Sequence, residues 1–122
     1  MASLEDKITE MLPLVSKPAR YLGNEINSIH KDHRKVDLKV ALAFPDTYEV
    51  GMSHLGLKIL YHILNSKENI VAERVYAPWL DAHEIMSKEG IPLFSLETHT
   101  LLKDFDIIGF SLQYELTYTN IL

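Results

Sequence analysis

Residues 38–64 read LKVALAFPDTYEVGMSHLGLKILYHIL. The near-continuous apolar run at residues 38–44 is typical of a parallel strand buried on both faces, and such a strand requires a crossover helix after it. Residues 54–64 are predicted to form that helix, and residues 45–53 form the turn between the two elements. In parallel sheets, ligands bind beyond the carboxyl ends of the strands, so the candidate site begins at this turn.

The rest of the chain continues the alternation of strand and helix. Residues 70–76 predict a second strand, and Pro78 is expected at the first position of a helix that Gly90 ends. Residues 92–97 predict a short edge strand, and residues 106–112 predict a third buried strand. This order predicts an α/β fold with right-handed crossovers: a Rossmann-like or flavodoxin-like three-layer fold with a mainly parallel sheet, truncated after about the third core strand.

The N-terminal segment has a different character. Residues 4–12 have the apolar spacing of a short amphipathic helix. Ser3 and Asp6 resemble a capping box at its start, and Pro13 is expected to stop it. Residues 13–28, with their prolines and mixed charges, predict an extended strap that lies on another part of the molecule.

These patterns divide the chain into two parts. Residues 1–37 are the N-terminal helix and strap, and residues 38–122 are a partial Rossmann-type domain. The polar run at residues 30–35 is expected to be a solvated linker between them. Residues 114–122 begin a helix that stops on an apolar face without a cap, so we expect the sequence to be a fragment of a longer protein.

Composition limits the functional classes. The chain has 122 residues, a formal charge of −5 and no cysteine. Its length fits one domain, and its acidic balance argues against direct binding of nucleic acid. No apolar run approaches the roughly 20 residues of a membrane span, so we expect a cytoplasmic protein without a membrane partner. The absence of cysteine excludes thiolate ligands to a metal or an iron–sulfur cluster within this chain.

The candidate crevice joins the turn after the first strand to the segment after the third. Gly51 would let the backbone approach a ligand, and Ser53 would cap the following helix, whose free amides favour an anionic group. The alternative is that these are only turn and cap residues. Arg74 and Trp79 could converge on the same edge, although Arg74 is more typical of a surface ion pair and Trp79 of a core. The candidate binding residues are Asp46, Tyr48, Glu49, Gly51, Ser53, His54, Gln113, Tyr114 and Glu115.

No pattern in the chain indicates catalysis. His30 and His33 have a spacing that could chelate a metal, but in a charge-rich linker a solvated pair is expected. The remaining histidines stand isolated, and no nucleophile–base order or paired-carboxylate pattern is present. No catalytic and no metal-binding residues are therefore assigned.

Four stretches resemble the N-terminal region of large radical S-adenosylmethionine (radical SAM) proteins of largely unassigned reaction. They are PARYLGNE at 18–25, ALAFPDTYEVGMSHLGL at 41–57, ERVYAPW at 73–79 and DFDIIGF at 104–110. In layout these proteins are similar to cobalamin-binding radical SAM enzymes, in which a Rossmann-like domain precedes a barrel with an iron–sulfur cluster.

The resemblance implies that the parent protein is an enzyme that uses a 4Fe–4S cluster and S-adenosylmethionine, and that this region covers or positions the barrel of the same chain. The fragment itself is expected to hold no cofactor and to be inert. The resemblance leaves two alternatives open at the strand ends: they bind a substrate or a corrinoid without a histidine ligand, or the domain has kept only the fold. The cobalamin motif Asp-x-His-x-x-Gly is not matched, because Asp46 and His54 are eight residues apart.

Two other interpretations stay open. The region could be a noncatalytic protein-interaction domain with a Rossmann-like fold, using the strap and strand ends as a docking surface. It could also be a flavodoxin-like receiver module, which the missing acidic pair after the first strand disfavours. An unfinished sheet would leave a free strand edge, which favours self-association of the fragment.

Overall fold

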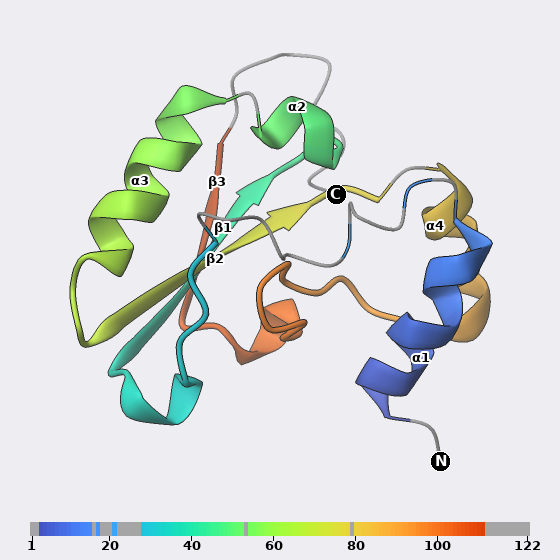
Figure 1. Ribbon diagram of the computed structural model, residues 1–122, viewed down its shortest axis with the longest axis horizontal. Coiled ribbons are helices and arrows are strands. Elements are labelled where there is room, and N and C mark those ends of the chain that lie inside the picture. Colours follow the sequence, from blue (N-terminus) through green and yellow to red (C-terminus); the bar gives the residue numbers. More distant parts are fainter. Residues whose placement is uncertain are drawn as a thin grey trace.

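The structure, a computed structural model, describes residues 3–15, 17, 21, 28–52, 54–78 and 80–111. In this part of the chain a parallel sheet has helix α3 on one side and helices α1 and α4 together on the other (Figure 1). The helices are α1 (Leu4–Met11), α2 (Tyr48–Met52), α3 (Leu55–Asn65) and α4 (Leu80–Glu89), with 3₁₀ turns η1 (Leu12–Leu14), η3 (His33–Lys35) and η4 (Leu102–Asp104). The strands are β1 (Leu38–Phe44), β2 (Ile70–Tyr76) and β3 (Ile107–Phe110).

The described strands form one parallel sheet in the order β2-β1-β3. The predicted boundaries of the first two strands are confirmed, and β3 pairs with β1, from Val40 opposite Ile107 to Ala43 opposite Phe110. The predicted α/β class is therefore confirmed, and the arrangement is consistent with a truncated Rossmann-like sheet.

The N-terminal helix starts at the predicted capping box. The Ser3 hydroxyl accepts a bond from the Asp6 amide at 3.2 Å, and the Asp6 carboxylate accepts one from the Ser3 amide at 3.3 Å. Helix α1 ends at Met11, next to the 3₁₀ turn that contains Pro13. The local sequence is sufficient here because both ends of the helix are determined by residues within one turn.

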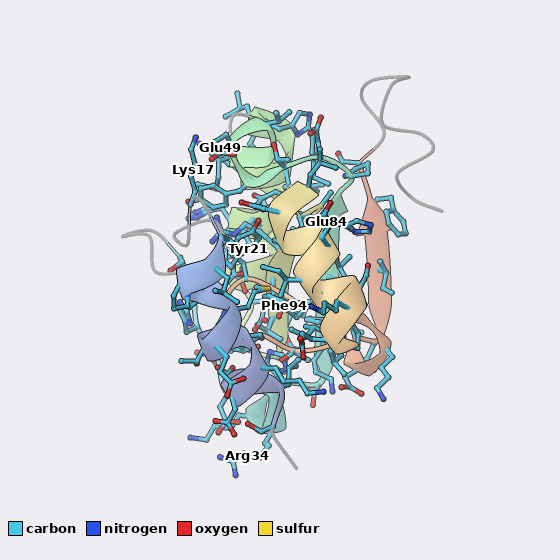
Figure 2. All side chains as sticks on the ribbon, turned by 90° about the vertical axis from the view of Figure 1, so that its right-hand side faces the viewer. Lys17, Tyr21, Arg34, Glu49, Glu84 and Phe94 are labelled. Carbon is cyan, nitrogen blue, oxygen red and sulfur yellow. The ribbon has the colours of Figure 1, made fainter. Side chains whose placement is uncertain are left out.

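Apolar side chains gather in separate clusters on the two sides of the sheet. On the α3 side, the even-numbered residues of β1 pack with Leu57 and Tyr61 of α3. On the other side, α1 and α4 form a cluster of their own, in which Ile8 and Met11 meet Ala82 and Met86. Tyr21 and Phe94 belong to this second cluster and lie beside the two helices in Figure 2.

The outer edge of β2 is closed by side chains and loop backbone. The Asn65 side chain both donates to the Ala72 carbonyl and accepts from the Ala72 amide, each at 2.9 Å. Farther along the strand, the Glu97 carboxylate accepts from the Arg74 amide at 3.1 Å, and the Leu96 amide donates to the Arg74 carbonyl at 2.8 Å. These bonds satisfy backbone groups that an edge strand would otherwise leave open.

Several predicted elements were wrong in detail. Residues 92–97 form no strand; in this region only an isolated bridge joins Phe94 and Leu101, and the segment runs along the edge of β2 instead. Pro78 lies two residues before α4 rather than at its first position, whereas Gly90, with φ of +67°, follows the last residue of α4 as expected.

No helix in the described ranges is long and apolar enough to cross a membrane.

The prediction that the third strand is buried was also wrong for the residues described. Ile107, Ile108 and Phe110 are 49%, 40% and 46% exposed. The apolar run does form a parallel strand, but no described element covers either of its faces.

Candidate functional site

A pocket of about 560 Å³ lies at the carboxyl ends of β1 and β2. The turns after the two strands provide one wall, and α4 with the segment after it provides the other. The lining residues are Asp46, Thr47, Ala77, Pro78, Leu80, His83, Met86, Ser87, Ile91 and Leu93. The pocket therefore occupies the edge of the sheet where open α/β folds bind their ligands.

Backbone hydrogen bonds fix the two strand-end turns against each other. The Asp46 amide donates to the Phe44 carbonyl at 2.8 Å, which folds the chain back immediately after β1. The Asp46 carbonyl accepts from the Ala77 amide at 2.8 Å, and one Asp46 carboxylate oxygen accepts from the Thr47 amide at 2.7 Å. The half-buried Asp46 carboxylate is thus held in position at the rim of the pocket.

The α4 wall combines polar and apolar groups. His83 and Ser87 are one helical turn apart on α4, and both line the pocket from exposed positions. Met86, Ile91 and Leu93 supply apolar surface beside them. The lining residues therefore include one carboxylate, an imidazole and the two hydroxyl residues Thr47 and Ser87 within a largely apolar lining, a composition typical of small-molecule sites.

The predicted site residues Tyr48, Glu49 and Gly51 do not line this pocket and make packing or surface contacts instead. The Tyr48 ring packs edge-on against Tyr76, with centroids 5.8 Å apart. Gly51 is buried in α2 with the Tyr76 ring against its α-carbon, so the residue permits close packing. Glu49 lies 3.8 Å from the ammonium group of Lys17, at an exposed position where such a pair contributes little (Figure 2).

The cap of α3 is His54, not Ser53 as predicted. The Nδ1 atom of His54 accepts a hydrogen bond from the Leu57 amide at 3.0 Å, and its ring packs on Phe44 with centroids 5.1 Å apart. Gly56 lies directly under the same ring, where a β-carbon would be 2.9 Å from Cε1 of His54. One imidazole nitrogen of His54 is therefore already used inside the protein.

Five residues that the sequence placed at the crevice lie outside the described ranges: Ser53, Trp79, Gln113, Tyr114 and Glu115. Their part in a crevice stays a prediction. The strands that carry these segments do lie as expected, because β1 and β3 are parallel neighbours whose carboxyl ends share one edge of the sheet.

Sequence reasoning missed a buried ion pair beneath α3. Arg74 was expected at the surface, but its side chain is 7% exposed and its Nε donates to the fully buried Glu97 carboxylate at 3.0 Å. The guanidinium also lies 4.8 Å from the ring centroid of Tyr61. Burial raises the pKa of Glu97, while Arg74 opposes that shift; burial and the nearby carboxylate also raise the pKa of Tyr61. A charged residue inside an apolar strand was the available signal, because such a charge needs a buried partner.

A second buried carboxylate corrects the prediction of a solvated linker at residues 30–35. His33 Nε2 lies 2.5 Å from Glu73, and the hydroxyls of Ser95 and Thr98 donate to the same carboxylate at 2.6 and 2.7 Å. Lys31 donates to three backbone carbonyls at the end of α3 and the start of β2. The polar segment therefore anchors the N-terminal part to the sheet.

Among the residues that the structure describes, no group of three or more His, Cys, Asp or Glu side chains could hold a metal ion. The Glu73 cluster is internally satisfied, because each of its polar groups is bonded to a protein group. The pocket at the strand ends is therefore taken as the candidate ligand site.

The family of N-terminal regions of radical SAM proteins matches residues 56–122, more than half of the chain. This chain belongs to that family. The matched range begins in α3 and includes β2, α4 and β3, so most of the pocket lining comes from it. The resemblance inferred from the four sequence stretches is thereby confirmed for a radical SAM N-terminal region.

One curated protein also shows similarity. DNA polymerase III PolC-type of Bacillus cereus is 26% identical over 103 residues, which is 84% of this chain and 6% of that protein. This chain thus spans only a small part of that relative's length. No solved structure matches the chain.

Proposed function

We propose that this radical SAM N-terminal region is a binding module that holds a small molecule, the substrate of its parent enzyme, in the strand-end pocket. The observation that carries the proposal is the pocket of about 560 Å³ at the carboxyl ends of two parallel strands. Clefts of roughly 300–1,000 Å³ accommodate ligands of drug size. Membership in the family supports an accessory role beside a catalytic part of the same protein.

The lining supports a particular ligand chemistry. The Asp46 carboxylate favours a cationic or hydrogen-bond-donating group, while Met86 and Leu93 favour an apolar body next to it. His83 and Ser87 can each donate or accept a hydrogen bond on the opposite wall. The proposed ligand is therefore a small, partly apolar molecule with a cationic or donor group.

A corrinoid bound through histidine does not fit these residues. Nδ1 of His54 accepts from the Leu57 amide, so the neutral ring carries its proton on Nε2, and ligating cobalt through either nitrogen would break that bond. His83 lines the pocket, but no described carboxylate is bonded to it in the way that orients a metal-ligating imidazole. For this reason we propose the substrate, rather than cobalamin, as the occupant.

The chemistry of the parent enzyme would come from groups outside this chain. A 4Fe–4S cluster with S-adenosylmethionine supplies a radical that abstracts substrate hydrogen, and its cysteine ligands cannot come from a sequence that has no cysteine. The part that we propose for this region is to hold and orient the substrate and to cover the barrel.

Disulfide tethering tests the pocket directly, because the chain has no cysteine of its own. Ser87→Cys introduces one thiol in the pocket, and Lys88→Cys introduces one on an exposed neighbouring position of α4 as a matched control. Each variant is equilibrated with cystamine, a cationic probe, and with the neutral 2-hydroxyethyl disulfide at increasing concentrations of reductant.

Intact-mass spectrometry then gives the reductant concentration at which each adduct is half lost. We expect the cystamine adduct at position 87 to resist several-fold more reductant than the adduct at position 88. Adding Asp46→Asn should remove that preference for the cationic probe. Equal retention of both probes at both positions would show that the pocket does not select such a ligand.

A further inference from the structure

The α3 side of β3 is uncovered in the described structure. Val40 and Leu42 face α3, and they lie opposite Ile107 and Gly109 in the register, so these two β3 residues share that face. Ile107 is 49% exposed, and a β-carbon at Gly109 would meet no atom within 4 Å. The face is therefore open directly above the strand.

The neighbouring flank of α3 is apolar and exposed. Leu60 is 48% exposed, and Leu64 beside it is partly buried. The buried stripe of α3 is formed by Leu57, Tyr61 and Asn65, and Asn65 reaches the outer edge of β2, where it bonds Ala72. At 100° per residue, Leu60 lies about 100° from Tyr61 on the side opposite to Asn65, so it faces the β3 side.

The other face of β3 adds to this surface, because Ile108 and Phe110 are also exposed. The two edges of the sheet also differ in how their backbone groups are bonded. Side chains and loop backbone close the outer edge of β2, whereas no strand in the described part of the chain pairs with the outer edge of β3. A strand that is apolar on both faces is typical of the interior of a parallel sheet.

We propose that this uncovered β3 surface, formed by Leu60, Ile107 and Gly109 with the outer edge of β3, is the docking site for the remainder of the same radical SAM protein. A strand of that remainder pairs with β3, and the apolar face of a helix packs beside α3 over Gly109. Two observations favour this occupant. The chain belongs to the family of N-terminal regions of radical SAM proteins, and among the described strands only the β3 edge of the sheet is open.

The proposal does not depend on the strand-end pocket. The missing side chain of Gly109 allows a helix to approach the sheet closely, and the exposed α3 flank supplies the second contact for that helix. The surface as a whole would become the interior of a larger sheet, so its apolar residues would be buried in the complete protein.

The test compares the same variants in this 122-residue chain and in the full-length radical SAM protein. Leu60→Glu places a charge on the docking flank, and Lys58→Glu, on a different flank of the same helix, is the control. In the full-length protein we expect Leu60→Glu to lower the Tm by about 5 °C or more, and Lys58→Glu to leave it nearly unchanged. In the 122-residue chain both changes should be small.

Two further measurements cover the case in which Leu60→Glu prevents folding. Gly109→Leu should be tolerated in the 122-residue chain, where the space is open, and should destabilise the full-length protein. In the unsubstituted proteins, hydrogen exchange at residues 107–110 should be at least tenfold slower in the full-length protein. Equal exchange in the two proteins, or a neutral Leu60→Glu in the full-length protein, would overturn the proposal. Sedimentation showing that Leu60→Glu only dissociates dimers of either protein would assign the surface to a second copy instead.

Discussion

Replacing Gly51 by alanine distinguishes packing from ligand binding at the turn after β1. A methyl group there would overlap two ring carbons of Tyr76 and would lie 3.0 Å from Cζ, whereas carbon atoms in contact are about 3.5–4.0 Å apart. The ring has little freedom to move, because Tyr76 is 9% exposed and packs edge-on against Tyr48. Its hydroxyl also lies 3.6 Å from the Met52 sulfur.

The expected magnitude is the difference of two effects. Overpacking of a buried site costs typically about 1–3 kcal/mol, and the overlap with Tyr76 places Gly51→Ala at the upper end of that range. The higher helix propensity of alanine than of glycine stabilises the folded state by about 1 kcal/mol. We therefore expect a net loss of about 2 kcal/mol in the free energy of unfolding, which lowers the urea midpoint by roughly 1 M.

Urea denaturation followed by circular dichroism measures this loss, with Gly109→Ala as the control because its β-carbon would meet no atom within 4 Å. A double-variant cycle with Tyr76→Leu should show a favourable coupling of about 1 kcal/mol, since the smaller side chain relieves the overlap. An unchanged midpoint in Gly51→Ala would refute the packing explanation and would return Gly51 to the list of ligand-contacting residues.

Three other predictions follow from the buried charges and from the absent cluster ligands. Arg74→Leu should cost about 3 kcal/mol at neutral pH, because it leaves Glu97 buried without its cation. Since the pKa of Glu97 lies above its usual 4.5, the cost of Arg74→Leu should grow as the pH rises past 4.5. Urea titrations at pH 4 and pH 7 measure this cost, and Arg34→Leu, at an exposed ion pair, is the control. A cost that does not change with pH would contradict the assignment. Titration with hydroxocobalamin should produce no spectral shift in the wild type or in His54→Ala, and a shift that His54→Ala abolishes would identify a histidine ligand. Anaerobic incubation with iron, sulfide and S-adenosylmethionine should give neither a cluster spectrum nor cleavage of the cofactor, and a stoichiometric cluster signal would disprove this expectation.

The sequence by itself determined the elements whose causes are local. The near-continuous apolar run at residues 38–44 set the limits of β1, because burial on both faces leaves such a signal. The apolar residues at both ends of 70–76 set the limits of β2, although Glu73 and Arg74 interrupt them. Ser3 and Asp6 set the start of α1 through hydrogen bonds that span three residues. The alternation of these elements also predicted that β1 and β3 would be parallel neighbours.

Only the tertiary structure decided which polar groups are buried and which apolar groups are exposed. Arg74 is buried because Glu97, 23 residues later, reaches the edge of β2, and His33 is anchored by Glu73, 40 residues away. Ile108 lies in an apolar run but is exposed, because its burial depends on elements that pack beside β3, and a local pattern does not specify those elements. The pocket has the same origin, since Asp46 and Ser87 come together only when two strand ends and α4 share one edge of the sheet. Burial and convergence are properties of pairs that are distant in the chain, and a periodic pattern reports only the neighbours of each residue.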